Sequence, residues 1–135
     1  MQHFLNVGDR EVKAYCFDKS AVQRYQQFFN MPQTTTVPLL MTARVWPLFS
    51  LFRPFKETAI RLVATEIETH YPLKVGEHYQ VTMAVLKVQQ IKSFQRYQMA
   101  LSFDQADTCH CRIIQTFVSR RVSSCVFQQK TCSTI

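Results

Sequence analysis

The chain has 135 residues, 47% of them hydrophobic and 13% aromatic, which is enough for one substantial core and too little for two ordinary domains. Sixteen Lys and Arg against nine Asp and Glu give a net charge of +7, which favours anionic partners without choosing among them. The start, MQHFLNVGDREV, lacks the pattern of a secretory signal, and the longest apolar run is interrupted by arginines and prolines, so we expect no membrane span and no membrane partner. These observations predict a soluble cytoplasmic protein with one domain over residues 1–122 and a tail over residues 123–135.

The sequence disfavours a disulfide framework and a nucleic-acid partner. The five cysteines are an odd number without a framework-like spacing, so reduced thiols are expected. RNA-binding motifs, a zinc-finger spacing and a convincing helix-turn-helix pattern are absent, so nucleic acid is not the expected partner. A phosphorylated cofactor or an acidic carrier protein would account for the same positive charge.

The N-terminal part predicts a turn, a strand and a helix. Residues 6–9 have the composition of a turn, and Glu11–Phe17 is expected to be a short strand. Asp18 can cap the helix expected over Lys19–Asn30. The spacing of the apolar residues in this helix predicts a buried face of Ala21, Val22, Tyr25, Phe28 and Phe29, with Gln23, Arg24, Gln26 and Gln27 outward.

An apolar helix is expected next. Pro38 suits its first turn, and Leu39–Phe52 would follow, kinked or divided at Pro47 because proline removes an internal hydrogen bond. Apolar residues occupy nearly every face of this segment, so burial on all sides is expected. A helix buried in that way needs a sheet around it.

The remaining residues predict that sheet. Ile60–His70 begins apolar on both faces, as expected for a central strand, and Tyr71–Glu77 breaks it. Two alternating strands follow, with inward residues Tyr79, Val81, Met83 and Val85 and then Tyr97, Met99, Leu101 and Phe103. Asp104–Asp107 suits a hairpin turn before a last strand ending at Phe117-Val118.

Three segments resemble the hot-dog superfamily, in particular its MaoC-like dehydratase and (R)-specific enoyl-thioester hydratase branch. They are NVGDREVKAYCFDKSAVQRYQQFF, VPLLMTARVWPLF and TEIETHYPLKVGEHYQVTMAV. The likeness covers roughly residues 5–121, and the third segment, with its Pro72-Leu73 and Gly76-Glu77 turn, is the most specific. The resemblance implies an α+β hot-dog fold, a long antiparallel sheet wrapped around a central apolar helix, and a pocket for acyl thioesters.

The resemblance also sets an expectation for catalysis. Family members that hydrate or dehydrate thioesters commonly carry Asp and His in a D-x-N-P-x-H segment, whereas Asn30–Leu40 contains neither residue. A second form of the family places a His at the position that corresponds to Leu62. Since proton transfer needs such groups, we expect no catalytic dyad and no hydratase activity by this chain alone.

Other reactive side chains have simpler roles. Asp18 and Glu66 are the carboxylates that could activate water in a thioesterase, but a helix cap and a strand residue are the expected roles. His70 and His78 flank a turn and should be exposed. Strand alternation places Cys109 and Cys111 on one side and His110 on the other, so no metal site and no cofactor are expected.

The leading interpretation is an acyl-CoA or acyl-carrier-protein binding protein of lipid metabolism, working as a homodimer or as a heterodimer with another hot-dog subunit. The substrate-binding candidates are Thr36, Thr42, Trp46, Arg61, Arg120 and Arg121, the arginines facing the phosphates or acidic carrier. Core packing is the simpler role for Trp46, and a hydrogen bond back to its own helix is the simpler role for Thr42. An acyl-CoA thioesterase and a structural or regulatory dimer without a ligand are the alternatives.

Overall fold

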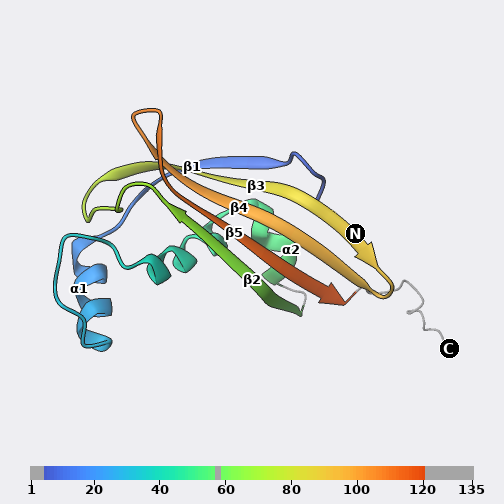
Figure 1. Cartoon of the computed structure of the whole chain (residues 1–135), viewed down its shortest axis with the longest axis horizontal. Helices are drawn as coiled ribbons and strands as arrows, with labels where there is room; N and C mark the ends of the chain where they lie inside the picture. The colour runs from blue at the N-terminus through green and yellow to red at the C-terminus, as the bar shows by residue number, and fades with distance from the viewer. Residues whose placement is uncertain (1–4, 57–58, 121–135) are drawn as a thin grey trace.

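A computed structural model describes residues 5–56 and 59–120 of the chain. Its strands are β1 (Arg10–Cys16), β2 (Ile60–Thr69), β3 (His78–Ile91), β4 (Phe94–Gln105) and β5 (Thr108–Arg120). They form one antiparallel sheet in the order β1-β3-β4-β5-β2. Figure 1 shows this sheet curving over the short helices that follow residue 38. The expected α+β architecture is therefore present.

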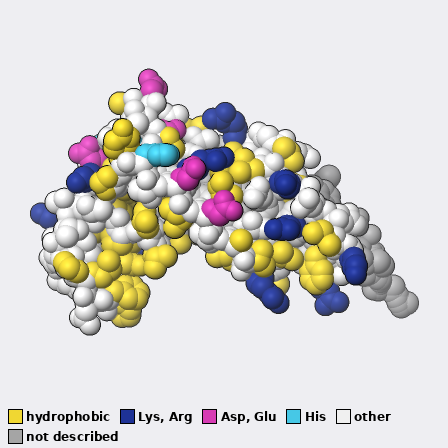
Figure 2. All heavy atoms as spheres, viewed as in Figure 1, with side chains coloured by type: hydrophobic (Ala, Val, Ile, Leu, Met, Phe, Trp, Pro, Cys, Tyr) yellow, Lys and Arg dark blue, Asp and Glu magenta, His cyan; other side chains and the backbone are white. Residues whose placement is uncertain are grey.

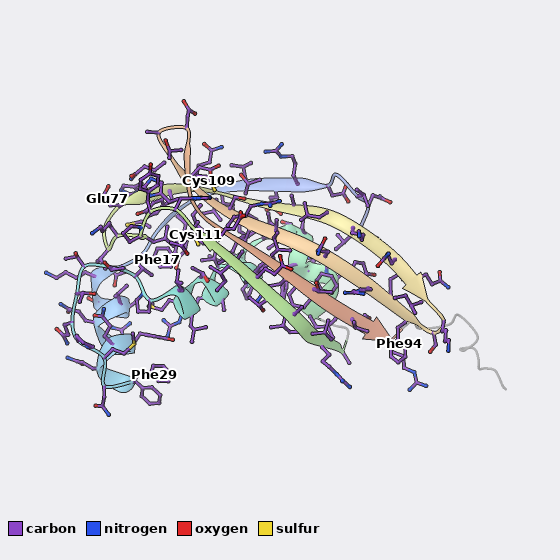
Figure 3. All side chains as sticks on the ribbon, in the orientation of Figure 1. Phe17, Phe29, Glu77, Phe94, Cys109 and Cys111 are labelled. Carbon is purple, nitrogen blue, oxygen red and sulfur yellow. The ribbon has the colours of Figure 1, made fainter. Side chains whose placement is uncertain are left out.

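The first helix, α1 (Lys19–Phe28), begins where predicted and ends two residues earlier. The Asp18 Oδ2 atom accepts a hydrogen bond from the Ala21 amide at 3.1 Å, which confirms the cap. The predicted buried face is wrong at its C-terminal end, because Phe28 and Phe29 are 80% and 55% exposed. Figure 3 shows Phe29 at the end of α1 that lies far from the sheet. Val22 is buried as predicted, whereas Gln26, which was predicted to face outward, is buried as well.

The predicted helix over Leu39–Phe52 is three short 3₁₀ segments followed by one α-helical turn. These are η1 (Leu39–Arg44), η2 (Trp46–Leu48), η3 (Ser50–Phe52) and α2 (Arg53–Lys56). Division at Pro47 was predicted, but the second interruption, at Phe49, was not. Phe49 is extended (φ −90°, ψ 140°), so the chain cannot continue as one helix there.

Burial of this segment on all sides is also wrong. Met41, Val45, Trp46 and Phe49 are at most 3% exposed and form the core beneath the sheet. Two leucines on the same segment point elsewhere, since Leu40 is 73% and Leu48 51% exposed. The packing is therefore one-sided, with an apolar surface left uncovered.

The alternation predicted for the two long strands is confirmed. The predicted inward residues of β3 and β4 are buried, with Leu101 and Phe103 both 0% exposed, except Tyr97, which is partly buried. The hairpin that joins β4 to β5 is confirmed as well: Ala106 and Asp107 form its two-residue loop, with φ of 50° and 61°. Two positive φ values match the right-handed twist of the flanking strands.

The prediction that β2 is a central strand is wrong. β2 lies at the edge of the sheet and pairs only with β5 among the described residues. Leu62 and Val63 are each 48% exposed and Ile67 is 41% exposed. A β-bulge at Val63 interrupts the pairing between Leu62 and Ala64. The apolar residues of β2 thus belong to an open edge, and the pattern alone could not distinguish this from the centre of a sheet.

Candidate functional site

The sheet has a helix side, which packs on η1–α2, and an outer face. The pairing register assigns β2 residues to these sides. Leu62 lies opposite Phe117 and Ile67 opposite Ile113, and both partners are buried core residues, so Leu62 and Ile67 face the helix side. Thr65 lies between them opposite Gln115. Arg61, Ala64, Glu66 and Glu68 alternate with them on the outer face.

The helix side of β2 is open, although the same side of β5 is closed. Ile113 and Phe117 are 2% and 6% exposed, whereas their partners Ile67 and Leu62 are nearly half exposed. A hydrogen bond joins Gln115 Nε2 to Thr65 Oγ1 at 3.3 Å along this row. We call Leu62, Thr65 and Ile67 the β2 apolar row. It lies on a strand whose outer edge has no pairing partner among the described residues.

Beneath β4 and β5, an aromatic cluster fills the space next to this row. The Trp46 and Phe117 ring centroids are 5.9 Å apart, those of Phe52 and Phe117 6.0 Å, and those of Phe55 and Tyr97 5.0 Å. Trp46 is 3% exposed, and its Nε1 has no hydrogen-bond partner among the described residues. A buried indole N–H normally has one. The aromatic cluster thus fills this part of the interior and contains a buried donor that has no partner among the described residues.

The threonine candidates are fixed by local bonds. The Thr42 hydroxyl donates to the Leu39 carbonyl oxygen and is 4% exposed, as the simpler interpretation predicted. Thr36 forms an isolated antiparallel bridge with Lys74, which ties the loop before η1 to the turn after β2. Both threonines therefore shape the entrance to the helical segment.

The arginine candidates lie elsewhere. Arg61 is opposite Val118 and Arg120 opposite Phe94, so both belong to the outer face, away from Trp46 and Thr42. Arg121 lies outside the described residues. The structure therefore groups Thr42 with Trp46 in the helical segment and does not bring the arginines to them. Arg44, in η1, has its guanidinium carbon 5.7 Å from the centre of the Tyr25 ring.

Two hollows open on the outer face, and the sequence analysis missed both. The residues Lys87, Gln89, Arg96 and Gln98 line the first. The second is larger; its floor includes Ala84 and Ala100, and Arg10, Asp104 and Arg112 are among its lining residues. In Figure 2, basic side chains lie over both halves of the visible face, whereas acidic side chains are confined to one half. Alternation along β4 could have placed Arg96 and Gln98 on the outer face. Alternation along β3 would have placed Lys87 inward, because a β-bulge at Leu86 shifts the register between Val85 and Lys87.

A β-bulge changes the faces expected of the cysteines near the β4–β5 hairpin. Phe103 lies opposite Cys111 and Asp104 opposite Cys109, so His110 is the extra residue and the two cysteines face opposite sides. The prediction that they share a side is therefore wrong. His110 contacts the rings of Tyr71 and Tyr79, with centroid distances of 5.2 and 5.6 Å. No group of three or more potential metal ligands occurs within the described part of the chain.

Both thiols are poor nucleophiles. Burial raises the pKa of the Cys111 thiol. Burial and then the hydrogen bond and charge of Asp104 raise the pKa of the Cys109 thiol. Because the thiolate is the reactive form, both changes suppress reactivity near neutral pH.

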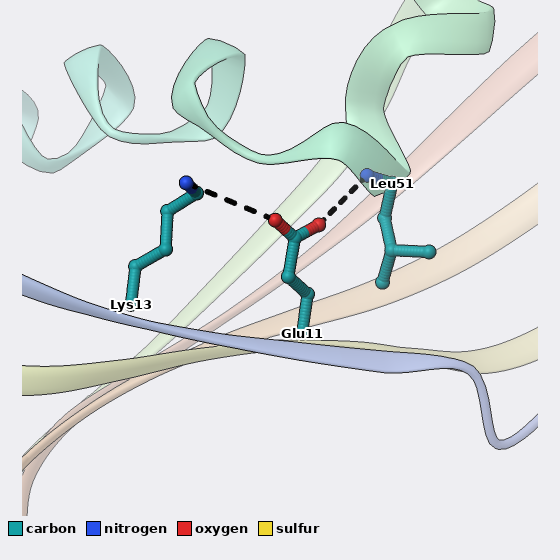
Figure 4. A network of polar contacts seen from close by, with 3 residues as sticks. All are labelled: Glu11, Lys13 and Leu51. Atoms are coloured by element: carbon teal, nitrogen blue, oxygen red, sulfur yellow. Dashed lines mark hydrogen bonds and ion pairs between the residues drawn. The ribbon is translucent and has the colours of Figure 1, made fainter.

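The carboxylates near the helix side are engaged in structure or exposed. Asp18 is the cap described above, Glu66 is exposed on the outer face of β2, and His70 and His78 are exposed as predicted. Glu11, on β1, was not singled out from the sequence. Its Oε1 accepts from the Leu51 amide at 3.0 Å and its Oε2 lies 4.0 Å from Lys13 Nζ (Figure 4). Glu11 therefore anchors η3 to the opposite edge of the sheet from β2.

Comparisons with known proteins agree on the family and the fold. The model of a family described as "Uncharacterised conserved protein VraC" matches residues 1–121. Protein VraC of Staphylococcus epidermidis is 34% identical over 122 residues, which are 90% of this chain and 100% of that protein. Among solved structures, the HadBC (3R-hydroxyacyl-ACP dehydratase) complex from Mycobacterium tuberculosis matches with a TM-score of 0.70 and 11% identity, over 83% of this chain and 96% of that one. The MaoC-like dehydratase from Rhodospirillum rubrum matches with a TM-score of 0.63 and 16% identity, over 87% and 94% of the two chains.

The solved structures show that the fold is the hot-dog fold, as the sequence resemblance implied. At 11% and 16% identity they carry no further statement about activity. A separate observation concerns the bilayer: none of the helices in residues 5–56 and 59–120 has the length and apolar character needed to cross one.

Proposed function

This chain belongs to the VraC family, and from its hot-dog fold and its open β2 edge we propose that it is an acyl-thioester-binding subunit that works in a pair with a second hot-dog subunit. The observation that carries the proposal is the β2 apolar row. A surface of this kind on a strand edge is stabilised when another subunit covers it. The acyl site would then lie between the subunits, next to Trp46.

The sequence of β2 supports pairing with a second copy of the same strand. If Val63 is left out as the bulge, a two-fold axis at Thr65 pairs the whole strand with itself in antiparallel register. Leu62 then meets Ile67 of the second copy on the helix side. Arg61 meets Glu68 of the second copy on the outer face, as an ion pair across strands. The apolar and charged positions are therefore self-complementary.

The aromatic cluster supports an acyl-binding role. An acyl chain that enters from the β2 edge would contact Phe117 and Trp46, whose rings already pack together. The thioester carbonyl could accept the hydrogen bond that the buried Trp46 Nε1 lacks among the described residues. Binding requires the cluster to rearrange, because the rings fill the interior of the single chain.

Hydratase activity by this subunit alone is not part of the proposal. Residues 30–40 contain no Asp and no His, Asp18 is a cap, and Glu66 faces away from the helix side. General acid–base catalysis would need such groups near the thioester. A partner hot-dog subunit that carries them would complete the chemistry, and HadBC is described as a 3R-hydroxyacyl-ACP dehydratase complex.

The filled interior favours one other candidate, a structural or regulatory dimer without a small ligand. Tryptophan fluorescence separates the two, because Trp46 is the only tryptophan in the chain. Titration with short- and long-chain acyl-CoA should change its emission, and free CoA should change it less. Trp46→Phe removes the signal, and calorimetry on that variant would show whether binding persists. No fluorescence or calorimetric response to any acyl thioester would reject the binding function and leave the structural dimer.

Charge reversal tests the assembly. Arg61→Glu and Glu68→Arg should each weaken dimerisation, and the double variant should recover much of the loss, since the pair is restored with opposite sense. Glu66→Arg is the matched control, because in this register Glu66 meets Ala64 of the second copy. Sedimentation equilibrium measures the dissociation constants. A monomeric wild-type chain at micromolar concentration would contradict homodimerisation. If that monomer forms a complex when it is mixed with another hot-dog subunit, the assembly is a heterodimer.

A further inference from the structure

The outer-face end of the β3–β4 hairpin combines exposed cations with exposed apolar side chains. The pairs across β3 and β4 are Lys87 with Gln98, Gln89 with Arg96, and Ile91 with Phe94, and Arg120 on β5 lies opposite Phe94. Lys92 occupies the turn with φ 54°. We call Lys87, Ile91, Lys92, Phe94, Arg96 and Arg120 the hairpin patch. We propose that the hairpin patch docks the protein on an anionic lipid surface.

The charge of the patch is uncompensated. No ion pair involving Lys87, Lys92, Arg96 or Arg120 occurs in the part of the chain that the structure describes. The acidic residues of the outer face, Glu66, Glu68 and Asp104, lie in register rows closer to the other end of the sheet, and in Figure 2 the right-hand half of the visible face has blue but no magenta side chains. The four cations of the patch therefore create a local positive field that attracts anions.

The exposed apolar residues Ile91 and Phe94 indicate which kind of anionic partner fits the patch. Ile91 is 47% and Phe94 45% exposed, and they lie opposite one another at the last paired position before the turn. Figure 3 shows Phe94 at the extremity of the molecule opposite to α1. Phosphate or carboxylate ligands in solution make no use of two apolar side chains at a tip. A bilayer does, because apolar residues enter the boundary between headgroups and acyl chains while cations contact the headgroups.

Nucleic acid fits the patch less well. Single-stranded nucleic acids bind grooves in which several aromatic rings stack with successive bases. Here Phe94 is the one ring of the patch, and its neighbour across the strands is aliphatic. The expectation of no membrane partner rested on the absence of spanning segments, which has no bearing on docking to a surface. The patch also lies on the opposite side of the sheet from the β2 apolar row, so this function is independent of thioester binding.

Vesicle flotation with the full chain tests the inference. The protein should bind vesicles of phosphatidylglycerol and phosphatidylcholine in equal parts, bind pure phosphatidylcholine weakly, and lose affinity as salt rises. Each cation near an anionic surface contributes about fivefold in affinity, so Lys87→Gln with Arg96→Gln should weaken binding by about 25-fold. Arg112→Gln is the matched control for either single substitution, since it also removes one positive charge from the same face, next to Glu68 and outside the patch.

The apolar pair is tested with Phe94→Ser, and with Ile91→Ser as a second variant of the same pair. Each should reduce binding to the anionic vesicles several-fold and leave binding to heparin unchanged, since heparin offers charge without an apolar phase. Urea unfolding verifies that these exposed substitutions keep the fold. The inference is overturned if the wild-type chain does not bind the vesicles, if Arg112→Gln weakens binding as much as the patch variants, or if duplex DNA binds more tightly than the vesicles with no effect of Phe94→Ser.

Discussion

On the helix side of the sheet, the strands β3 and β4 differ from the edge strand β2 in how completely their apolar residues are covered. On β3 and β4, the inward side chains such as Met83 and Leu101 are 0% exposed beneath the helical segment. On β2, the inward side chains Leu62 and Ile67 remain almost half exposed although their chemistry is the same. The difference teaches that the described residues close the core beneath the middle of the sheet and leave the β2 edge open. The proposed second subunit would cover that edge.

The strongest test of this contrast compares two apolar truncations. Leu101→Ala should lower the free energy of unfolding by about 2–5 kcal/mol, because it leaves a cavity in a closed core. Ile67→Ala should cost far less when the protein is dilute and monomeric. Urea denaturation at two protein concentrations measures both effects. Equal losses in the dilute protein would show that β2 is already covered within the chain.

A second test replaces the apolar row with charge. Ile67→Asp should convert a dimer to a folded monomer, because an unpaired carboxylate would be buried in the interface. Light scattering gives the mass, and circular dichroism gives the secondary structure. Val12→Asp is a suitable control, since Val12 is 46% exposed but lies on β1, at the other edge. A dimer that survives Ile67→Asp would place the interface elsewhere.

A smaller effect is expected at the start of α1, which lies outside both regions. Asp18→Ala should lower the free energy of unfolding by about 1 kcal/mol through loss of the cap to the Ala21 amide. Asp18→Asn keeps an oxygen acceptor and should cost much less. Chemical denaturation of the two variants measures the difference. Similar losses for both would mean that the charge of Asp18, and not its hydrogen bond, is what stabilises the helix.

The smallest effect concerns Cys109. Asp104 contributes to its raised pKa after burial, so Asp104→Asn should lower that pKa, increase the thiolate fraction and speed alkylation by iodoacetamide at pH 8. The pKa of Cys111, raised by burial, should not respond, which makes Cys111 the internal control. Mass spectrometry resolves the two sites. If Cys111 reacts faster as well, the substitution has opened the hairpin and the electrostatic explanation fails.

Local patterns predicted most of the individual elements. Alternation identified the inward residues of β3 and β4, Asp18 marked the start of α1, and the segment from Asp104 to Asp107 marked the hairpin turn. These features depend on neighbours in the chain, so the sequence contains the necessary information. The prediction of which way side chains face failed where a β-bulge or an extended residue interrupts a regular strand or helix. The bulges at Val63 and His110 and the extended Phe49 shift side chains to new faces without any clear local signature.

The sequence by itself thus determined the hot-dog fold class, the inward faces of the long strands, and an apolar segment led by Pro38. Only the tertiary structure decided that β2 lies at an edge, that the helical segment covers one side of the core, and that Arg61 and Arg120 lie on the outer face, away from Trp46. The physical reason is that a strand has the same pattern of apolar residues whether its own chain or a second subunit covers them. Strand order and packing settle which of these applies, because they depend on residues far apart in the chain.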